Sequence, residues 1–149
     1  MLRRIITEEI AEFIIWIVEI TAPVFFDNDR ASAFRVLNER KIWHLYINNF
    51  ETKRNLSIQD VISEVKELLE IEKIPSLLSG TLHEEDTKYI KAIVQGISKK
   101  YNWNYSVTLD RFYNSSVCRV LSDTKIGLSG FAPEEVLTLF EQEALHKYK

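Results

Sequence analysis

The sequence predicts an all-α protein, a helical bundle of about eight helices in one compact globule. The 149 residues include only 4 Gly and 3 Pro, too few to build the turns of a many-stranded β protein. Apolar residues recur every three or four positions through most of the chain, as in helices that bury one face. Several of these segments follow Ser, Thr, Asp or Asn, the residues that most often cap a helix N-terminus.

The first helix is expected over Thr7–Phe26. Thr7 can act as its N-cap, and Glu8 and Glu9 suit its first turn because the helix dipole favours negative charge there. Apolar residues cover more than one side of this helix, so it should be buried on more than one side. Pro23 should kink or end it. The polar residues 27–29 can then cap a second helix, whose inward face carries Ala31, Phe34 and Leu37.

Two further helices are expected before residue 71. The run Ile42–Ile47 predicts a helix and not a strand, because its apolar residues share a helical face and no Asn-Gly turn follows. Ser57 and Asp60 then resemble a capping box that opens a helix. The inner face of this helix is expected to carry Val61, Ile62, Val65, Leu68 and Leu69, and its outer face Glu64, Glu67 and Glu70.

The same order of elements follows in the second half of the chain. A capping box at Thr81–Glu84 opens a long helix that ends near Lys100, Ser106 can cap a shorter one, and Pro133 opens the last. Gly127 and Gly130 indicate a turn. The inward residues are expected to be Tyr89, Ile90, Ile93, Val94, Ile97, Leu109, Phe112, Tyr113, Val117, Val120, Leu121, Val136, Leu137, Leu139 and Phe140.

The two halves match at an offset of roughly 75 residues, which pairs Ile17 with Ile93 and Val61 with Val136. A tandem duplication explains this match, and a chance alignment of amphipathic helices is the alternative. In a duplication, residues 1–74 and 81–149 would form two four-helix halves joined by a linker over 75–80. The halves would share one core, because each alone is small for an independent core.

The net charge of −3 lies in the first part of the chain, since residues 1–76 hold 10 basic and 13 acidic residues and the remainder holds 9 of each. Neither part has the cation excess of a nonspecific phosphate binder, so no nucleic acid is expected as a partner. Glu8, Glu9 and Glu12 interrupt the N-terminal apolar run that a secretory signal requires. The run Phe13–Val18 is too short for a membrane span. We therefore expect a soluble, cytoplasmic protein without a membrane partner.

No strong catalytic or cofactor motif is present, so neither a cofactor nor a metal site is expected. In the cluster that begins at His83, only His83 and Asp86 share a helical face, and two ligands do not make a zinc site. Cys118 has no neighbouring His and is read as a small buried apolar residue. His44 follows Arg40 by four residues, which leaves open a ribonuclease pair in which Arg holds phosphate and His moves a proton.

The three tryptophans are expected in different surroundings. Trp16 is predicted to lie in the core. Trp43 and Trp103 stand beside polar residues, where one ring edge can stay exposed, and exposed Trp, Tyr and Arg often anchor protein interfaces. Packing in the core is the alternative for both. Arg111 and Arg119 could meet an acidic partner or belong to an ordinary solvated face.

Two stretches resemble an uncharacterised family of small bacterial helical domains. Phe112–Leu128 and the closing acidic helix Leu139–Glu143 resemble one form of the family. Ala33–Leu37, Trp43–Ile47 and the capped helix after Ser57 are similar to a sister form, as in a tandem copy. Genes of this family often lie beside genes for predicted toxins of the ADP-ribosyltransferase type. The resemblance implies an antitoxin-like or immunity role.

We therefore expect a non-enzymatic protein-binding module that masks a partner, in this reading a toxin. One candidate binding surface is the acidic helix around Glu64 and Glu67. The other is an aromatic–arginine patch of Trp43, Tyr46 and Arg119.

Two other functions are weighed against this expectation. A helical ribonuclease that uses Arg40 and His44 is the alternative from the enzyme class. A DNA-binding repressor is disfavoured by the net charge. The oligomeric state, including a homo-oligomer, stays open.

Overall fold

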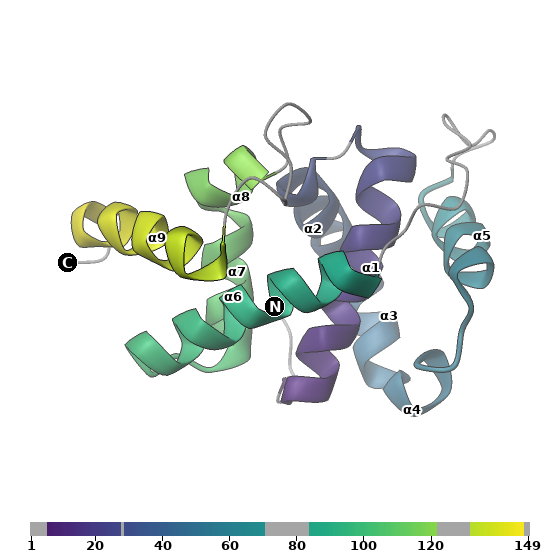
Figure 1. Cartoon of the computed structure of the whole chain (residues 1–149). Helices are drawn as coiled ribbons and strands as arrows, with labels where there is room; N and C mark the ends of the chain where they lie inside the picture. Colours follow the sequence, from purple (N-terminus) through teal and green to yellow (C-terminus); the bar gives the residue numbers. More distant parts are fainter. Residues whose placement is uncertain (1–5, 28, 71–83, 122–131, 148–149) are drawn as a thin grey trace.

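The backbone of the computed structural model is helical, without a strand, over the residues that it describes, which are 6–27, 29–70, 84–121 and 132–147 (Figure 1). The all-α prediction is therefore confirmed. The described helices are α1 Glu8–Phe25, α2 Arg30–Glu39, α3 Ile42–Asn48, α4 Phe50–Lys53, α5 Ile58–Leu68, α6 Glu84–Tyr101, α7 Tyr105–Tyr113, α8 Ser116–Leu121 and α9 Pro133–Lys147.

Helix α1 lies at the centre of the molecule. It packs on α2, α5, α6 and α7, and twelve of its 18 residues are buried, as its apolar pattern predicts. Pro23 lies inside α1, and the helix continues for two residues beyond it. Helices α5 and α9 lie at opposite edges of the bundle, with α1 between them (Figure 1). No helix in the described part of the chain combines the length and apolar character needed to cross a membrane.

Local capping sets the start of several helices. The Thr7 hydroxyl accepts a hydrogen bond from the Ile10 amide, and the Asp29 carboxylate accepts one from the Ser32 amide. Ser57 and Asp60 form the predicted capping box, with distances of 3.1 and 3.2 Å between their side chains and backbone amides. Such caps satisfy amides that have no partner inside the helix.

Some of the local predictions are wrong. Asn104, and not Ser106, caps α7, because the Asn104 side chain accepts from the Val107 amide and Ser106 lies inside the first turn. Leu68 and Leu139, predicted to face inward, are 36% and 38% exposed. Both lie on the flank of a stripe whose buried residues recur every four positions, and the described helices leave that flank partly exposed. Val120, also predicted inward, is 36% exposed.

Some predicted features lie outside the described residues. They are the linker over 75–80, the capping box at Thr81–Glu84 and the turn at Gly127 and Gly130.

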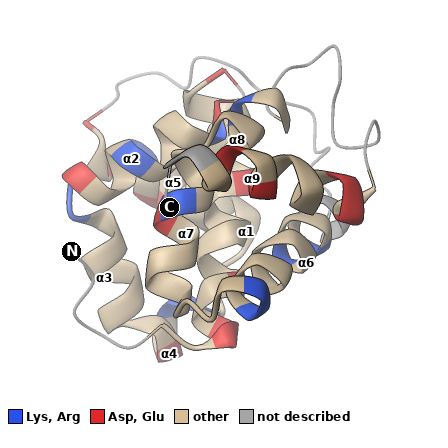
Figure 2. Ribbon diagram, turned by 90° about the vertical axis from the view of Figure 1, so that its left-hand side faces the viewer, with Lys and Arg blue, Asp and Glu red and all other residues tan. Residues whose placement is uncertain are grey.

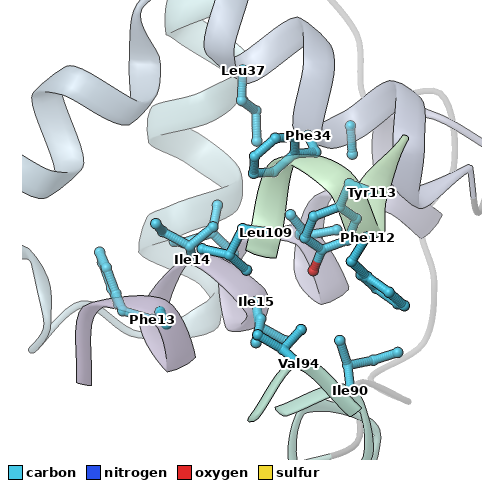
Figure 3. Close-up of a cluster of buried hydrophobic side chains, with 14 of the residues drawn as sticks. Phe13, Ile14, Ile15, Phe34, Leu37, Ile90, Val94, Leu109, Phe112 and Tyr113 are labelled. Atoms are coloured by element: carbon cyan, nitrogen blue, oxygen red, sulfur yellow. The ribbon is translucent and has the colours of Figure 1, made fainter. Parts of the chain in front are cut away.

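The buried residues of both parts of the chain form one apolar cluster. Its centre lies where α1 and α2 meet α6 and α7, and Figure 3 shows Phe34 of α2 beside Leu109 and Tyr113 of α7. The rings of Phe34 and Tyr113 stack with their centroids 4.7 Å apart. Side chains from distant parts of the sequence therefore fill a common core.

The helices and their buried positions recur at a nearly constant offset. The starts of α6, α7, α8 and α9 follow those of α1, α2, α3 and α5 by 74 to 76 residues. Glu135 accepts a hydrogen bond from the Ala132 amide, as Asp60 does from the Ser57 amide 75 residues earlier. The matched buried pairs include Ile14 and Ile90, Ile17 and Ile93, Val18 and Val94, Phe34 and Leu109, Leu37 and Phe112, Val61 and Val136, and Val65 and Phe140.

A buried ion pair ties α1 to α2. The Arg30 guanidinium donates through Nε and one terminal nitrogen to the two oxygens of Glu19, at 2.6 and 2.9 Å. Its other terminal nitrogen donates to the Leu121 carbonyl at the end of α8, at 3.0 Å. The side chains of Arg30 and Glu19 are 13% and 7% exposed. Removing one partner would leave a charge with little access to water.

The Tyr113 hydroxyl is buried near this ion pair and has no hydrogen-bond partner among the described residues. Burial raises the pKa of Tyr113 well above its ordinary value, and the nearby Glu19 carboxylate adds to the increase. Tyr113 is therefore buried in its neutral, protonated form.

We predict that Arg30→Ala lowers the free energy of unfolding by about 3–5 kcal/mol, because Glu19 stays buried without its counter-charge. Urea unfolding at neutral pH measures this change. The matched control is Arg35→Ala, which removes a 3.9 Å pair with Glu39 whose side chains are 59% and 66% exposed. That variant should lose less than about 1 kcal/mol. Equal losses in the two variants would contradict the prediction.

We predict that Tyr113→Phe weakens the dependence of stability on alkaline pH. In the unfolded chain a Tyr ionises near pH ~10, whereas the folded-state pKa is higher. The contribution of Tyr113 is therefore constant below pH ~10 and is lost as the pH rises towards the folded-state pKa. Phe cannot ionise, so the free energy of unfolding, measured with urea at pH ~7 and ~11, should fall less between these two pH values in the variant than in the unaltered protein. An unchanged loss would rule out a contribution from Tyr113.

Candidate functional site

An open groove of about 340 Å³ lies between the N-terminal half of α1, the turn from α4 to α5, and the start of α6. Its apolar surface comes from the rings of Phe13, Trp16 and Phe50 and from Leu56, with Thr87 beside them. Its charged rim consists of Glu9, Glu12, Arg54 and Lys88. Concave surfaces with apolar walls and a few polar groups are the usual places for ligand or side-chain binding.

The aromatic surface of the groove is a small set of ring contacts. Phe13 stacks on Trp16 with centroids 6.0 Å apart and packs edge to face on Phe50 at 5.4 Å. Phe13 and Phe50 are buried, whereas Trp16 is only half-buried. Trp16 therefore offers the most accessible ring in the groove.

The charges on the rim are largely paired within the protein. Arg54 lies over the Phe50 ring at 5.0 Å, and its Nη1 is 3.4 Å from Oε2 of Glu9. On the other side, Lys91 lies 2.8 Å from Oε2 of Glu12. The side chains of Glu9 and Glu12 remain 70% and 43% exposed. Their oxygens can still accept hydrogen bonds, but the rim has little unbalanced charge.

Helix α5 lies at the edge of the molecule (Figure 1), and acidic residues on it and just after its end face solvent. Asp60, Glu67 and Glu70 are exposed, as the sequence predicts for the last two. Glu67 and Glu70 form no ion pair with another residue in the described part of the chain. Arg54 and Leu56 of the groove lead directly into the Ser57 cap of α5. The groove therefore adjoins the start of α5, whereas Glu67 and Glu70 lie at and just after the other end of this helix, about 15 Å or more along its axis.

Glu64 is less available than its neighbours on α5. It lies 2.9 Å from Lys53, and the two side chains are 26% and 20% exposed. Lys53 also lies over the ring of Tyr46 at 5.9 Å. Burial and the nearby Glu64 carboxylate raise the pKa of Tyr46. The structure thus brings together two predicted site residues, Tyr46 and Glu64. Lys53 of α4 contacts both of them and so connects α3 with α5.

The predicted aromatic–arginine patch does not form. Trp43 and Tyr46 are both 0% exposed, and the Trp43 indole donates to the Phe34 carbonyl. Arg119 is exposed on α8, which packs on α2, α7 and α9, whereas α3 packs on α2 and α4. Trp43 was expected to keep one ring edge exposed because polar residues flank it, and Tyr46 was placed in the same patch, but both rings are buried in the core.

The predicted ribonuclease pair also lacks its expected geometry. Arg40 follows the last residue of α2, and Lys41 adopts a left-handed conformation with φ of 61° before α3 begins. Arg40 and His44 therefore do not lie one turn apart on a continuous helix. The spacing in sequence that suggested a shared face does not apply across this break.

The remaining chemical candidates are structural or lie outside the described side chains. Cys118 is fully buried, as predicted. The side chains of His83, Asp86 and His146 are outside the described set. Among the described residues, no group of three or more His, Cys, Asp or Glu is placed to hold a metal ion.

Sequence reasoning missed Trp16, which it placed in the core. Three consecutive apolar residues precede Trp16, and two follow it, so periodicity alone does not show which of them faces outward. One usable signal was the offset of 76 residues, which matches Trp16 to Ala92, an exposed residue on α6. This correspondence places Trp16 on the outer side of α1.

The charged positions on the face seen in Figure 2 are of both signs and interspersed. No family model, curated protein or solved structure gave a match to this chain.

Proposed function

We propose that this chain is a protein-binding module of the antitoxin or immunity kind, which acts in the cytoplasm by covering the basic or substrate-binding face of a toxin. The observation that carries the proposal is that one helix, α5, borders the aromatic-walled groove at its start and exposes carboxylates without a described ion pair at and just after its other end. The resemblance to helical domains encoded beside predicted toxins supports the class of partner.

The α5 face fits a basic partner. Val61 and Val65 hold the helix on the core and are fully buried, so the opposite side can meet another protein without unfolding. Glu67 and Glu70 have no described counter-charge to lose on binding. Complementary charge mainly raises the rate of encounter and selects the partner.

The groove supplies the apolar part that such an interface needs. Protein interfaces usually combine a few buried aromatic anchors with a polar rim. Here Trp16 and Leu56 form half-buried apolar walls, and the rim residues Glu9 and Arg54 are exposed. Together the groove and α5 provide both parts within one region.

We also infer that the chain arose by tandem duplication of a helical unit. The constant offset of helix starts, the matched buried positions and the equivalent hydrogen bonds of Asp60 and Glu135 support this inference. The two copies differ in surface chemistry, because Glu64 and Glu70 correspond to Leu139 and Leu145 at an offset of 75. Duplication followed by divergence accounts for these differences between the two helices.

Co-expression with the products of the adjacent genes tests the proposed function. We expect one of these products to form a complex that survives size exclusion and to lose its toxicity in the presence of this chain. The control is an unrelated protein of similar size and charge. Absence of a complex with every neighbouring product, at low as well as physiological salt, would refute the proposal.

We predict that Glu67→Lys/Glu70→Lys slows association with that partner about tenfold or more at low salt, because it reverses the charge of the steering surface. Stopped-flow or surface-based kinetics measures the rate. The control, Asp110→Lys/Glu134→Lys, makes the same change in net charge at exposed positions on α7 and α9, which lie away from α5 (Figure 1). Rates are compared only between variants with unchanged unfolding transitions. An equal effect of both double variants would show that net charge, and not α5, governs association.

A further inference from the structure

The groove beside α1 has features of a specific binding site that the fold itself does not require. Trp16 is the half-buried residue of its aromatic wall. Helix α6 has the same length as α1 and buries the counterparts of Ile14, Ile17 and Val18, yet it carries Ala92 at the position that matches Trp16. A large ring at this point is therefore unnecessary for packing a helix of this kind. The ring enlarges an accessible aromatic surface instead.

The walls favour an aromatic ligand group. Phe13 and Trp16 lie at an interplanar angle of 28°, and Phe50 meets Phe13 at 69°. An added ring could stack on Trp16, the accessible member of this cluster, because aromatic rings prefer offset stacked or edge-to-face contacts. The volume of about 340 Å³ is at the small end for ligand sites and suits one ring system.

The rim favours a neutral group with a hydrogen-bond donor. The rim carries two carboxylates and two cations, so it gives a charged ligand no net attraction. Arg54 is paired with Glu9, and Glu12 with Lys91, whereas Lys88 is exposed. The carboxylates of Glu9 and Glu12 keep exposed oxygens that can accept an additional hydrogen bond. An indole has an apolar body and one N–H donor, which matches both the walls and the rim.

We propose that the groove binds a tryptophan side chain presented by a protein partner. The indole ring stacks on Trp16, and its N–H donates to Glu9 or Glu12. The inference rests on the proposed function only in assigning the tryptophan to a protein. It does not depend on the α5 charges or on the partner's being a toxin.

Titration of the unaltered protein with N-acetylated amino acid amides tests this site. Amide and indole resonances of Trp16, Arg54 and Thr87 are followed by two-dimensional NMR. N-acetyl-tryptophanamide should shift them saturably and bind about fivefold more tightly than N-acetyl-leucinamide, as expected for one added ring contact. N-acetyl-phenylalaninamide, which has a ring without a donor, should fall between them.

Two variants locate the binding. Trp16→Leu keeps an apolar side chain but removes the ring, so the affinity for N-acetyl-tryptophanamide should fall about fivefold. Trp103→Leu is the matched control, because Trp103 is also half-buried but stacks on Tyr101 in a separate cluster at the end of α6. The affinity of the Trp103→Leu variant for N-acetyl-tryptophanamide should be unchanged. Unfolding curves establish that both variants are folded.

Several results would overturn the inference. Tighter binding of an N-acetyl-arginine amide would identify a cation site, and equal binding of the leucine and tryptophan amides would identify an unspecific apolar surface. Absence of saturable shifts would show that the groove takes no such group. These amide comparisons use the unaltered protein, so they decide the proposal even if Trp16→Leu does not fold. A partner complex that forms normally despite these results would leave the proposed function standing.

Discussion

The ion pair of Glu19 and Arg30 is the constraint on which the arrangement of the helices depends. Glu19 lies in the middle of a helix that is buried on most sides, so its charge requires a counter-charge inside the protein. Arg30 supplies it from the first residue of α2 and also binds the Leu121 carbonyl at the end of α8. One guanidinium therefore links elements 91 residues apart. Such a pair specifies a particular arrangement more than it adds stability over an apolar core.

The central position of α1 explains where a binding surface can form. Four helices pack on it and bury most of its residues, which leaves the side of Trp16 near the N-terminal half as its open face. The turn after α4 and the start of α6 border this side and convert it into a groove. The groove is thus a consequence of how neighbouring helices meet α1. Its aromatic composition distinguishes it from the corresponding position on α6, where Ala92 stands.

Local interactions explain which predictions from the sequence were accurate. The caps at Thr7, Asp29 and Ser57 join residues three positions apart, so the sequence pattern contains both partners. Burial of a particular apolar side chain depends on what lies across from it. Trp16 stands among apolar residues and lines a groove, whereas Trp43 stands beside polar residues and is fully buried. Leu139 was predicted to face inward for the same reason, because the sequence does not show what lies across from it. The described helices leave its side of α9 partly exposed.

The sequence by itself determined the helical class, most helix starts and the repeated order of elements, because periodicity and capping act within about one helical turn. Only the tertiary structure decided that Glu19 meets Arg30, that Tyr46 is enclosed near Glu64, and that Trp16 faces a groove. These features join residues separated by more than one turn, and in the groove by more than 70 positions. Their formation depends on how whole helices pack, which local patterns do not encode.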